Sequence, residues 1–98
     1  MATSKALEGF DKAYAYAVQH GATLTYCRSD SFLVHFFGTD LRFWIDTYKG
    51  TITPEGKAFA ALPNWVWLKS EQAQYGEPKG VYKLLRFLVG GLHRHGVL

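Results

Sequence analysis

Residues 22–53 read ATLTYCRSDSFLVHFFGTDLRFWIDTYKGTIT, and this stretch decides the fold. Apolar residues alternate with other residues along it, and short segments containing Ser, Asp or Gly interrupt the alternation at 28–30, 38–40 and 49–50. A period of two is typical of a strand with one buried face, while Ser, Asp and Gly favour the tight turns of hairpins. The stretch therefore predicts a meander of three antiparallel strands, with a short fourth strand over 51–53.

The lengths of the turns predict which residues face each other, because a turn fixes the register of its hairpin. We assign a three-residue turn to 28–30 and two-residue turns to 39–40 and 49–50. The predicted pairs are Leu24 with Val34, Tyr26 with Phe32, Cys27 with Ser31, Val34 with Ile45, Phe36 with Phe43, and Thr47 with Ile52. The face expected to line the core then carries Leu24, Tyr26, Phe32, Val34, Phe36, Leu41, Phe43, Ile45 and Ile52.

The opposite face of the predicted sheet is mixed, with Thr25, Cys27, Leu33, His35, Phe37, Arg42, Trp44, Asp46 and Tyr48. In the predicted register Phe37 faces Arg42, and His35 faces Trp44. A sheet face in contact with water is usually plainer. Phe37 and Trp44 therefore require a cover, which is a helix of this chain, a second subunit or a partner. Aromatic and basic side chains on a sheet are also a surface on which single-stranded bases stack.

The residues before the sheet predict an N-terminal helix. Thr3 or Ser4 can cap it, and Gly21 suits the left-handed position just after its end, near Gln19 or His20. Its predicted apolar stripe consists of Leu7, Phe10, Tyr14 and Val18, flanked by Ala6, Ala13 and Ala17. The small alanines predict a close approach of the helix to the sheet.

The residues after the sheet predict two to three further helices. Thr53-Pro54-Glu55 has the pattern of a helix start, and short helices are expected over 57–62 and 65–75. Trp65 and Trp67 are two positions apart, so they point in different directions on such a helix. Part of this aromatic cluster is therefore expected to be exposed.

The last predicted helix runs from Val81 to about His95. Its apolar stripe consists of Val81, Leu84, Leu85, Leu88 and Leu92, and its basic stripe of Lys79, Lys83, Arg86, His93 and Arg94. Gly90 and Gly91 weaken the helix by about 1 kcal/mol each. The pair marks either a kink or a point of close contact. The basic stripe is a candidate surface for phosphates or for an acidic protein.

Size and composition predict one compact α+β domain over 1–98. Cys27 is the single cysteine, so no internal disulfide can form and a reducing compartment is favoured. No apolar run reaches the ~20 residues that cross a bilayer, and the N-terminus lacks a signal-peptide pattern. A cytoplasmic location without membrane contact is therefore expected. The net charge of +3 raises encounter rates with nucleic acid or acidic proteins and identifies neither.

No residue pattern in the chain predicts catalysis, a metal or a cofactor. The four histidines, His20, His35, His93 and His95, are scattered along the sequence, unlike the ligands of a zinc site. The predicted register places Cys27 too far from His35 for a thiolate pair. The glycines form no phosphate-binding motif, and Asp40 and Asp46 do not form a carboxylate pair. The chain is therefore expected to be no enzyme and to hold no cofactor.

The order helix, three strands, helix over Ser4 to Leu62 resembles that of a double-stranded-RNA-binding domain. In that family a basic cluster at the start of the second helix places lysines across the RNA groove. The matching residues here, 54–58, read PEGKA and supply one lysine and one acid. The resemblance therefore implies an arrangement of elements, and the residues that would bind RNA are missing.

Aromatic residues on two sides, a basic helix and the lack of site chemistry favour a non-enzymatic protein-binding module. Its small size suggests an inhibitor, carried by a phage or mobile element, of a host protein or nucleoprotein complex with an acidic or apolar surface. The alternative is a nucleic-acid-binding domain that uses the basic helix face and the aromatic sheet face. The residues expected to bind the partner are His35, Phe37, Arg42, Trp44, Trp65, Trp67, Lys79, Lys83, Arg86 and Arg94.

Overall fold

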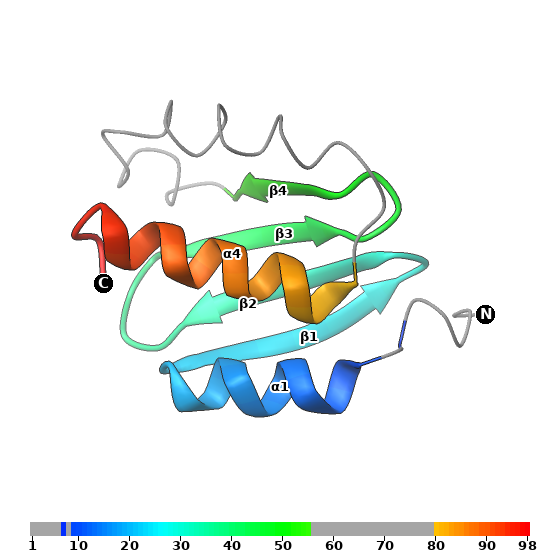
Figure 1. Cartoon of the computed structure of the whole chain (residues 1–98), viewed down its shortest axis with the longest axis horizontal. Helices are drawn as coiled ribbons and strands as arrows, with labels where there is room; N and C mark the ends of the chain where they lie inside the picture. Colours follow the sequence, from blue (N-terminus) through cyan, green and yellow to red (C-terminus); the bar gives the residue numbers. More distant parts are fainter. Residues whose placement is uncertain (1–6, 8, 56–79) are drawn as a thin grey trace.

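The computed structural model describes residue 7, residues 9–55 and residues 80–98. Its elements are α1 (Phe10–Gln19), β1 (Ala22–Arg28), β2 (Ser31–Phe36), β3 (Arg42–Asp46), β4 (Thr51–Pro54) and α4 (Val81–Arg94). The strands form one antiparallel sheet in the order β1-β2-β3-β4, so each strand pairs with the next along the chain (Figure 1). The predicted α+β class and antiparallel meander are confirmed, including the short fourth strand.

The part of the chain after the sheet contains one helix, α4, among the described residues. The helices expected over 57–62 and 65–75 lie outside the described residues, as do Trp65, Trp67 and Lys79. The structure therefore supports an N-terminal helix, a four-stranded meander and a C-terminal helix.

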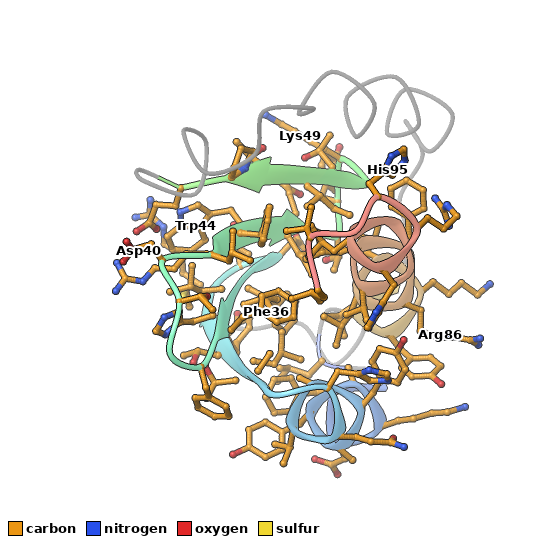
Figure 2. The ribbon with its side chains drawn as sticks, turned by 90° about the vertical axis from the view of Figure 1, so that its left-hand side faces the viewer. Phe36, Asp40, Trp44, Lys49, Arg86 and His95 are labelled. Atoms are coloured by element: carbon orange, nitrogen blue, oxygen red, sulfur yellow. The ribbon has the colours of Figure 1, made fainter. Side chains whose placement is uncertain are left out.

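Both helices lie on the same side of the sheet (Figures 1 and 2). α1 packs mainly on β1, α4 packs on β3 and β4, and the two helices also pack on each other. They run in the same direction (Figure 1). Lys12 and Tyr16 contact Tyr82 at the start of α4. His20, just after α1, contacts His93 near the end of α4. The core lies between this helical layer and the sheet.

The predicted core face of the sheet is confirmed. Eight of its nine residues are buried, and Tyr26 packs at the edge of the same cluster. α1 adds Ala13 and Ala17, and α4 adds its apolar stripe together with Val89. Full burial of a large apolar side chain stabilises a fold by about 1.5–3 kcal/mol. The driving force for folding is therefore the burial of one sheet face under two helices.

The register between β1 and β2 is as predicted, with Tyr26 opposite Phe32 and Leu24 opposite Val34. The pairing of Ser31 is different, because the register shifts between Tyr26 and Arg28. This β-bulge places an extra residue in β1, so that Arg28 faces Ser31. The predicted pairing of Cys27 with Ser31 is therefore wrong.

The registers between β2 and β3 and between β3 and β4 differ from the prediction by two residues. Val34 faces Phe43, Phe32 faces Ile45, and Ile45 faces Ile52. The predicted pairs of Phe36 with Phe43, Val34 with Ile45 and Thr47 with Ile52 are wrong. A two-residue offset keeps every side chain on its own face, since the side-chain period of a strand is two. The core face was therefore predicted correctly from an incorrect register.

Side-chain hydrogen bonds in the two turns explain the offset. The Phe36 amide donates to the carbonyl oxygen of Leu41 across the first turn at 3.0 Å. Within that turn Thr39 Oγ1 donates to the Phe36 carbonyl at 2.8 Å and accepts from the Leu41 amide at 3.0 Å. In the second turn Asp46 Oδ1 accepts from the amides of Tyr48 and Lys49 at 2.9 Å each. Both connections are therefore four residues long.

α1 begins later than predicted. Its first residue is Phe10, preceded by Gly9 in the left-handed region with φ 78°. The Phe10 amide donates to the carbonyl oxygen of Leu7 at 3.0 Å, which forms a turn before the helix. The prediction of one continuous helix up to Gln19 or His20 from a cap at Thr3 or Ser4 is therefore wrong at Gly9, and Thr3 and Ser4 themselves lie outside the described residues. The predicted end is confirmed, because Gly21 follows the helix with φ 77°.

The buried side of α1 is also rotated relative to the predicted stripe. Ala13 and Ala17 are fully buried, and Phe10 packs against the core. The predicted stripe residues Tyr14 and Val18 are 46% and 50% exposed. The alanines, which bring the helix close to β1, therefore determine its orientation.

Ala17→Leu is expected to lower the free energy of unfolding by about 1–3 kcal/mol, because a larger side chain has no room between α1 and β1. Ala15→Leu, on the exposed side of the same helix, is expected to change it by less than about 0.5 kcal/mol. Urea unfolding followed by circular dichroism measures both. Equal effects of the two substitutions would contradict the close packing of α1.

Thr53-Pro54-Glu55 ends a strand and does not start a helix. Pro54 is buried and faces Phe43 as the last residue of β4. The Glu55 amide donates to the Arg42 carbonyl at 2.9 Å and continues the pairing beyond Pro54. Proline is tolerated at strand ends and sheet edges, because its missing N–H is not needed there. The helix start predicted at these residues is therefore wrong.

α4 runs without a break through Gly90 and Gly91. Gly91 is buried, and a Cβ atom placed on Gly90 would lie 3.6 Å from a terminal guanidinium nitrogen of Arg94. The pair therefore interrupts no part of the helix, and the 3.6 Å distance at Gly90 is an ordinary van der Waals contact with a flexible side chain. Gly96 ends the helix with φ 72°, and the Val97 amide donates to the Leu92 carbonyl at 2.9 Å. Among the described residues, neither helix has the length and apolar character needed to cross a membrane.

Candidate functional site

One candidate surface is the side of the sheet that faces away from α1 and α4. Strand alternation places Leu33 and His35 of β2 and Arg42 and Trp44 of β3 on this side. Figure 2 shows Trp44 on the opposite side of the sheet from the helices. We call these four residues the sheet-face site.

The pairing of β2 with β3 determines which residues are neighbours in the sheet-face site. Leu33 faces Trp44, and His35 faces Arg42. The Cβ atoms of directly opposed residues lie about 4.5–5.5 Å apart in an antiparallel sheet. The predicted pairing of His35 with Trp44 is wrong, because the register is offset by two residues. The site consequently has an apolar half and a basic half.

His35 is held in place by the turn that follows its strand. Its Nε2 atom lies 2.9 Å from the carbonyl oxygen of Thr39. Because a carbonyl oxygen only accepts, Nε2 carries the proton of this bond. The other ring nitrogen, Nδ1, is then available to a partner. The Thr39 hydroxyl is itself hydrogen-bonded within the turn. The turn that positions His35 is therefore held by its own hydrogen bonds.

Phe37 lies at the end of β2 and not opposite Arg42. Its amide donates to the Gly21 carbonyl at 2.8 Å, and its side chain is 57% exposed. The predicted pairing of Phe37 with Arg42 is therefore wrong. Phe37 borders the sheet-face site as an exposed aromatic ring at the beginning of the turn.

A second candidate surface lies where α1 meets α4. Lys12, Tyr16 and His20 line one side of it, at successive four-residue steps along α1. Tyr82, Arg86 and His93 line the other side, along α4. We call these six residues the α1–α4 seam.

Ring contacts and cation–π contacts join the residues of the α1–α4 seam. Lys12 Nζ lies 4.6 Å from the centre of the Tyr82 ring, and Arg86 Cζ lies 5.6 Å from it. Tyr16 meets the same ring edge-on, with centroids 5.7 Å apart. A cation within about 6 Å of an aromatic ring is attracted by it, by about 0.5–1 kcal/mol at exposed sites. Tyr82 therefore holds two cations from different helices near each other.

The far end of the α1–α4 seam contains two histidines. The rings of Tyr16 and His20 have centroids 4.3 Å apart, and the rings of His20 and His93 have centroids 5.9 Å apart. The structure thus brings together two histidines that lie far apart in the sequence. Within the described ranges, no three His, Cys, Asp or Glu side chains gather to form a possible metal site.

The described residues of the predicted basic stripe, Lys83, Arg86, His93 and Arg94, are all exposed, and Lys79 lies outside the described residues. The structure separates these residues from the sheet-face site, because the helical layer and that site lie on opposite sides of the sheet (Figure 2). Those predicted binding residues that the structure describes therefore belong to two distinct surfaces.

Sequence reasoning missed the contribution of α1 to the basic surface. Lys12, Tyr16 and His20 recur every fourth residue, which places them along one side of a helix. This spacing was the available signal. The spacing within α1 does not predict the contacts with Tyr82, because those contacts depend on how α1 packs on α4 in the tertiary structure.

Cys27 is exposed, and its sulfur lies 3.8 Å from the carbonyl oxygen of Thr25. His35 is opposite Thr23 on the neighbouring strand and so is not the cross-strand partner of the thiol.

Comparison of the chain with models of protein families, with curated proteins and with solved structures found no match. None of these comparisons shows a relation to double-stranded-RNA-binding domains. Pro54, which that resemblance places at the start of a helix, belongs to β4.

Proposed function

We propose that the chain is a non-enzymatic protein-binding module whose sheet-face site receives an apolar side chain of its partner. The single observation that carries the proposal is the pair of Leu33 and Trp44, side by side on the sheet face away from both described helices. Both side chains are partly exposed. Tryptophan is enriched among the residues that contribute most to protein interfaces.

The neighbours of this pair define the chemistry of the partner. Arg42 is exposed beside His35, and a guanidinium group forms two parallel hydrogen bonds with a carboxylate. The partner surface that fits is an apolar side chain followed by an aspartate or glutamate. The apolar side chain would cover Trp44 and Leu33, and the carboxylate would bind Arg42.

The size of the chain suits a protein that acts by occupying a surface of a larger one. We propose an inhibitor of a host protein or nucleoprotein complex that acts in the cytoplasm. Trp65 and Trp67, which lie outside the described residues, are proposed as further contacts with the partner on the basis of their sequence alone.

The test is retention of a partner on the immobilised full chain from nuclease-treated cell lysate. Trp44→Ala is expected to reduce affinity for the retained protein by roughly 30-fold or more, the loss associated with an interface residue worth about 2 kcal/mol. Tyr48→Ala is the matched control, because Tyr48 is a 70% exposed aromatic residue in the turn after β3. It is expected to retain the partner.

Two results would overturn the proposal. One is a stoichiometric partner that binds equally well to Trp44→Ala and to Arg42→Glu, with both variants folded by circular dichroism. The other is the absence of any protein at stoichiometric amounts once nucleic acid has been digested.

A further inference from the structure

The α1–α4 seam concentrates positive charge on the helical side of the molecule. Lys12, Arg86 and His93 are exposed on it, and Lys83 extends the basic surface along α4. α4 contains no acidic residue. The acidic residue of α1 is Asp11, which helical geometry places about 100° away from Lys12 and about 140–180° away from Tyr16 and His20. Little opposing charge therefore comes from the two helices.

Contacts within the seam hold two of these cations close to each other. Tyr82 lies within cation–π distance of both Lys12 and Arg86. Because Tyr82 is itself packed against Tyr16 and the core, its ring is a fixed support. The two positive charges are thus held on neighbouring helices by one aromatic ring.

The dimensions of the seam match an extended polyanion better than a small anion. At a rise of about 1.5 Å per residue, the eight positions from Lys12 to His20 span about 12 Å. One strand of B-DNA carries a phosphate about every 3.4 Å along the helix axis. A strand lying along the seam would therefore present more than one phosphate to it.

The seam contains no aliphatic side chain and no tryptophan, unlike the sheet-face site with its pair of Leu33 and Trp44. Its six residues are one lysine, one arginine, two histidines and two tyrosines. A protein interface usually has an apolar, well-desolvated centre, whereas binding to a phosphate backbone depends mainly on positive charge.

We propose that the α1–α4 seam binds the phosphate backbone of a nucleic acid, with Lys12 and Arg86 as the principal phosphate contacts. This surface is separate from the sheet-face site, so the chain can hold a protein on one side of the sheet and a nucleic acid on the other. A module of this kind would act on a nucleoprotein complex by contacting both of its components.

The test measures binding of the full chain to a fluorescent single-stranded and a fluorescent double-stranded oligonucleotide by anisotropy at 50 and 200 mM salt. The double variant Lys12→Glu with Arg86→Glu is expected to lose at least tenfold in affinity at 50 mM salt. For this variant the slope of log affinity against log salt concentration should become shallower by about two, because each phosphate contact contributes about one to that slope.

The matched control is Arg28→Glu with Lys49→Glu, which changes the net charge by the same amount at two exposed positions outside the seam. This control is expected to lose less than threefold in affinity for the oligonucleotide. Lys12→Gln with Arg86→Gln removes the two charges without reversing them. Its affinity should lie between that of the unsubstituted chain and that of the charge-reversed variant. Circular dichroism melting confirms that each variant is folded.

Several outcomes would overturn the proposal. They are equal losses for the seam and control variants, binding that does not weaken with salt, and competition by poly-glutamate or inorganic phosphate as effective as by unlabelled oligonucleotide. Trp44→Ala should leave oligonucleotide binding unchanged, so failure of this proposal is distinguishable from failure of the proposed protein interface.

Discussion

Phe36→Ala is expected to lower the free energy of unfolding by about 3–5 kcal/mol, whereas Phe37→Ala should lower it by less than about 1 kcal/mol. The two phenylalanines are adjacent in the sequence, yet Phe36 is 2% exposed and Phe37 is 57% exposed. The Phe36 ring meets that of Phe43 edge-on, with centroids 6.2 Å apart. Truncation of Phe36 therefore removes buried area and an aromatic pair and leaves a cavity under α4.

Chemical denaturation of the two variants in parallel measures this difference. Each substitution removes the same atoms, so any effect on the unfolded chain is nearly the same in both. Similar losses of stability would contradict the orientation of β2, which places even-numbered residues in the core.

Leu88→Ala is expected to lower the free energy of unfolding by about 2–5 kcal/mol. Leu88 is fully buried in the middle of α4, on the side that faces the sheet. The cost is large because α4 covers β3 and β4, and the strands cannot move to fill the space without breaking their pairing. The measurement is the midpoint and slope of urea unfolding.

Lys83→Ala is the control for Leu88→Ala on the same helix. Lys83 is exposed, and alanine has the higher helix propensity, so the change should be within about 0.5 kcal/mol. A small effect of Leu88→Ala would mean that α4 contributes little to the core. A loss of cooperativity would instead show that the sheet remains partly structured when α4 detaches.

The faces of the sheet could be predicted from the sequence, because alternation depends only on the chain itself. Phe32, Val34 and Phe36 are apolar at every second position, and only one face of an antiparallel sheet needs to be buried. The register could not be predicted in the same way. It depends on hydrogen bonds of Thr39 and Asp46 that lengthen both turns, and either turn length leaves the same residues buried.

The helices show the same division between local and tertiary information. Gly21 ends α1 as predicted, because a positive φ is a local requirement that glycine meets. The predicted close approach of the alanines to the sheet is confirmed, since Ala13 and Ala17 are fully buried. The predicted stripe is wrong at Tyr14 and Val18, which are about half exposed, because close packing on the sheet favours the small side chains.

The candidate surfaces were predicted in part. Trp44 and Arg42 belong together on one face, and Arg86 belongs to an exposed basic face, as the sequence indicates. Lys12 joins Arg86 only through the Tyr82 ring between two helices that are separated by the whole sheet in the sequence. No spacing rule within one element predicts such a junction.

The turns at 37–40 and 47–50 bear on how the length of this chain can change over evolution or by design. Removing or adding a pair of residues within 37–40 or 47–50 preserves the parity of the downstream strand, so its interior and exterior residues keep their environments. A single-residue indel exchanges Phe43 and Ile45 with Arg42 and Trp44 only if the turn keeps its length. To keep the faces, an odd step requires a turn of a different length or a bulge like the one between Tyr26 and Arg28.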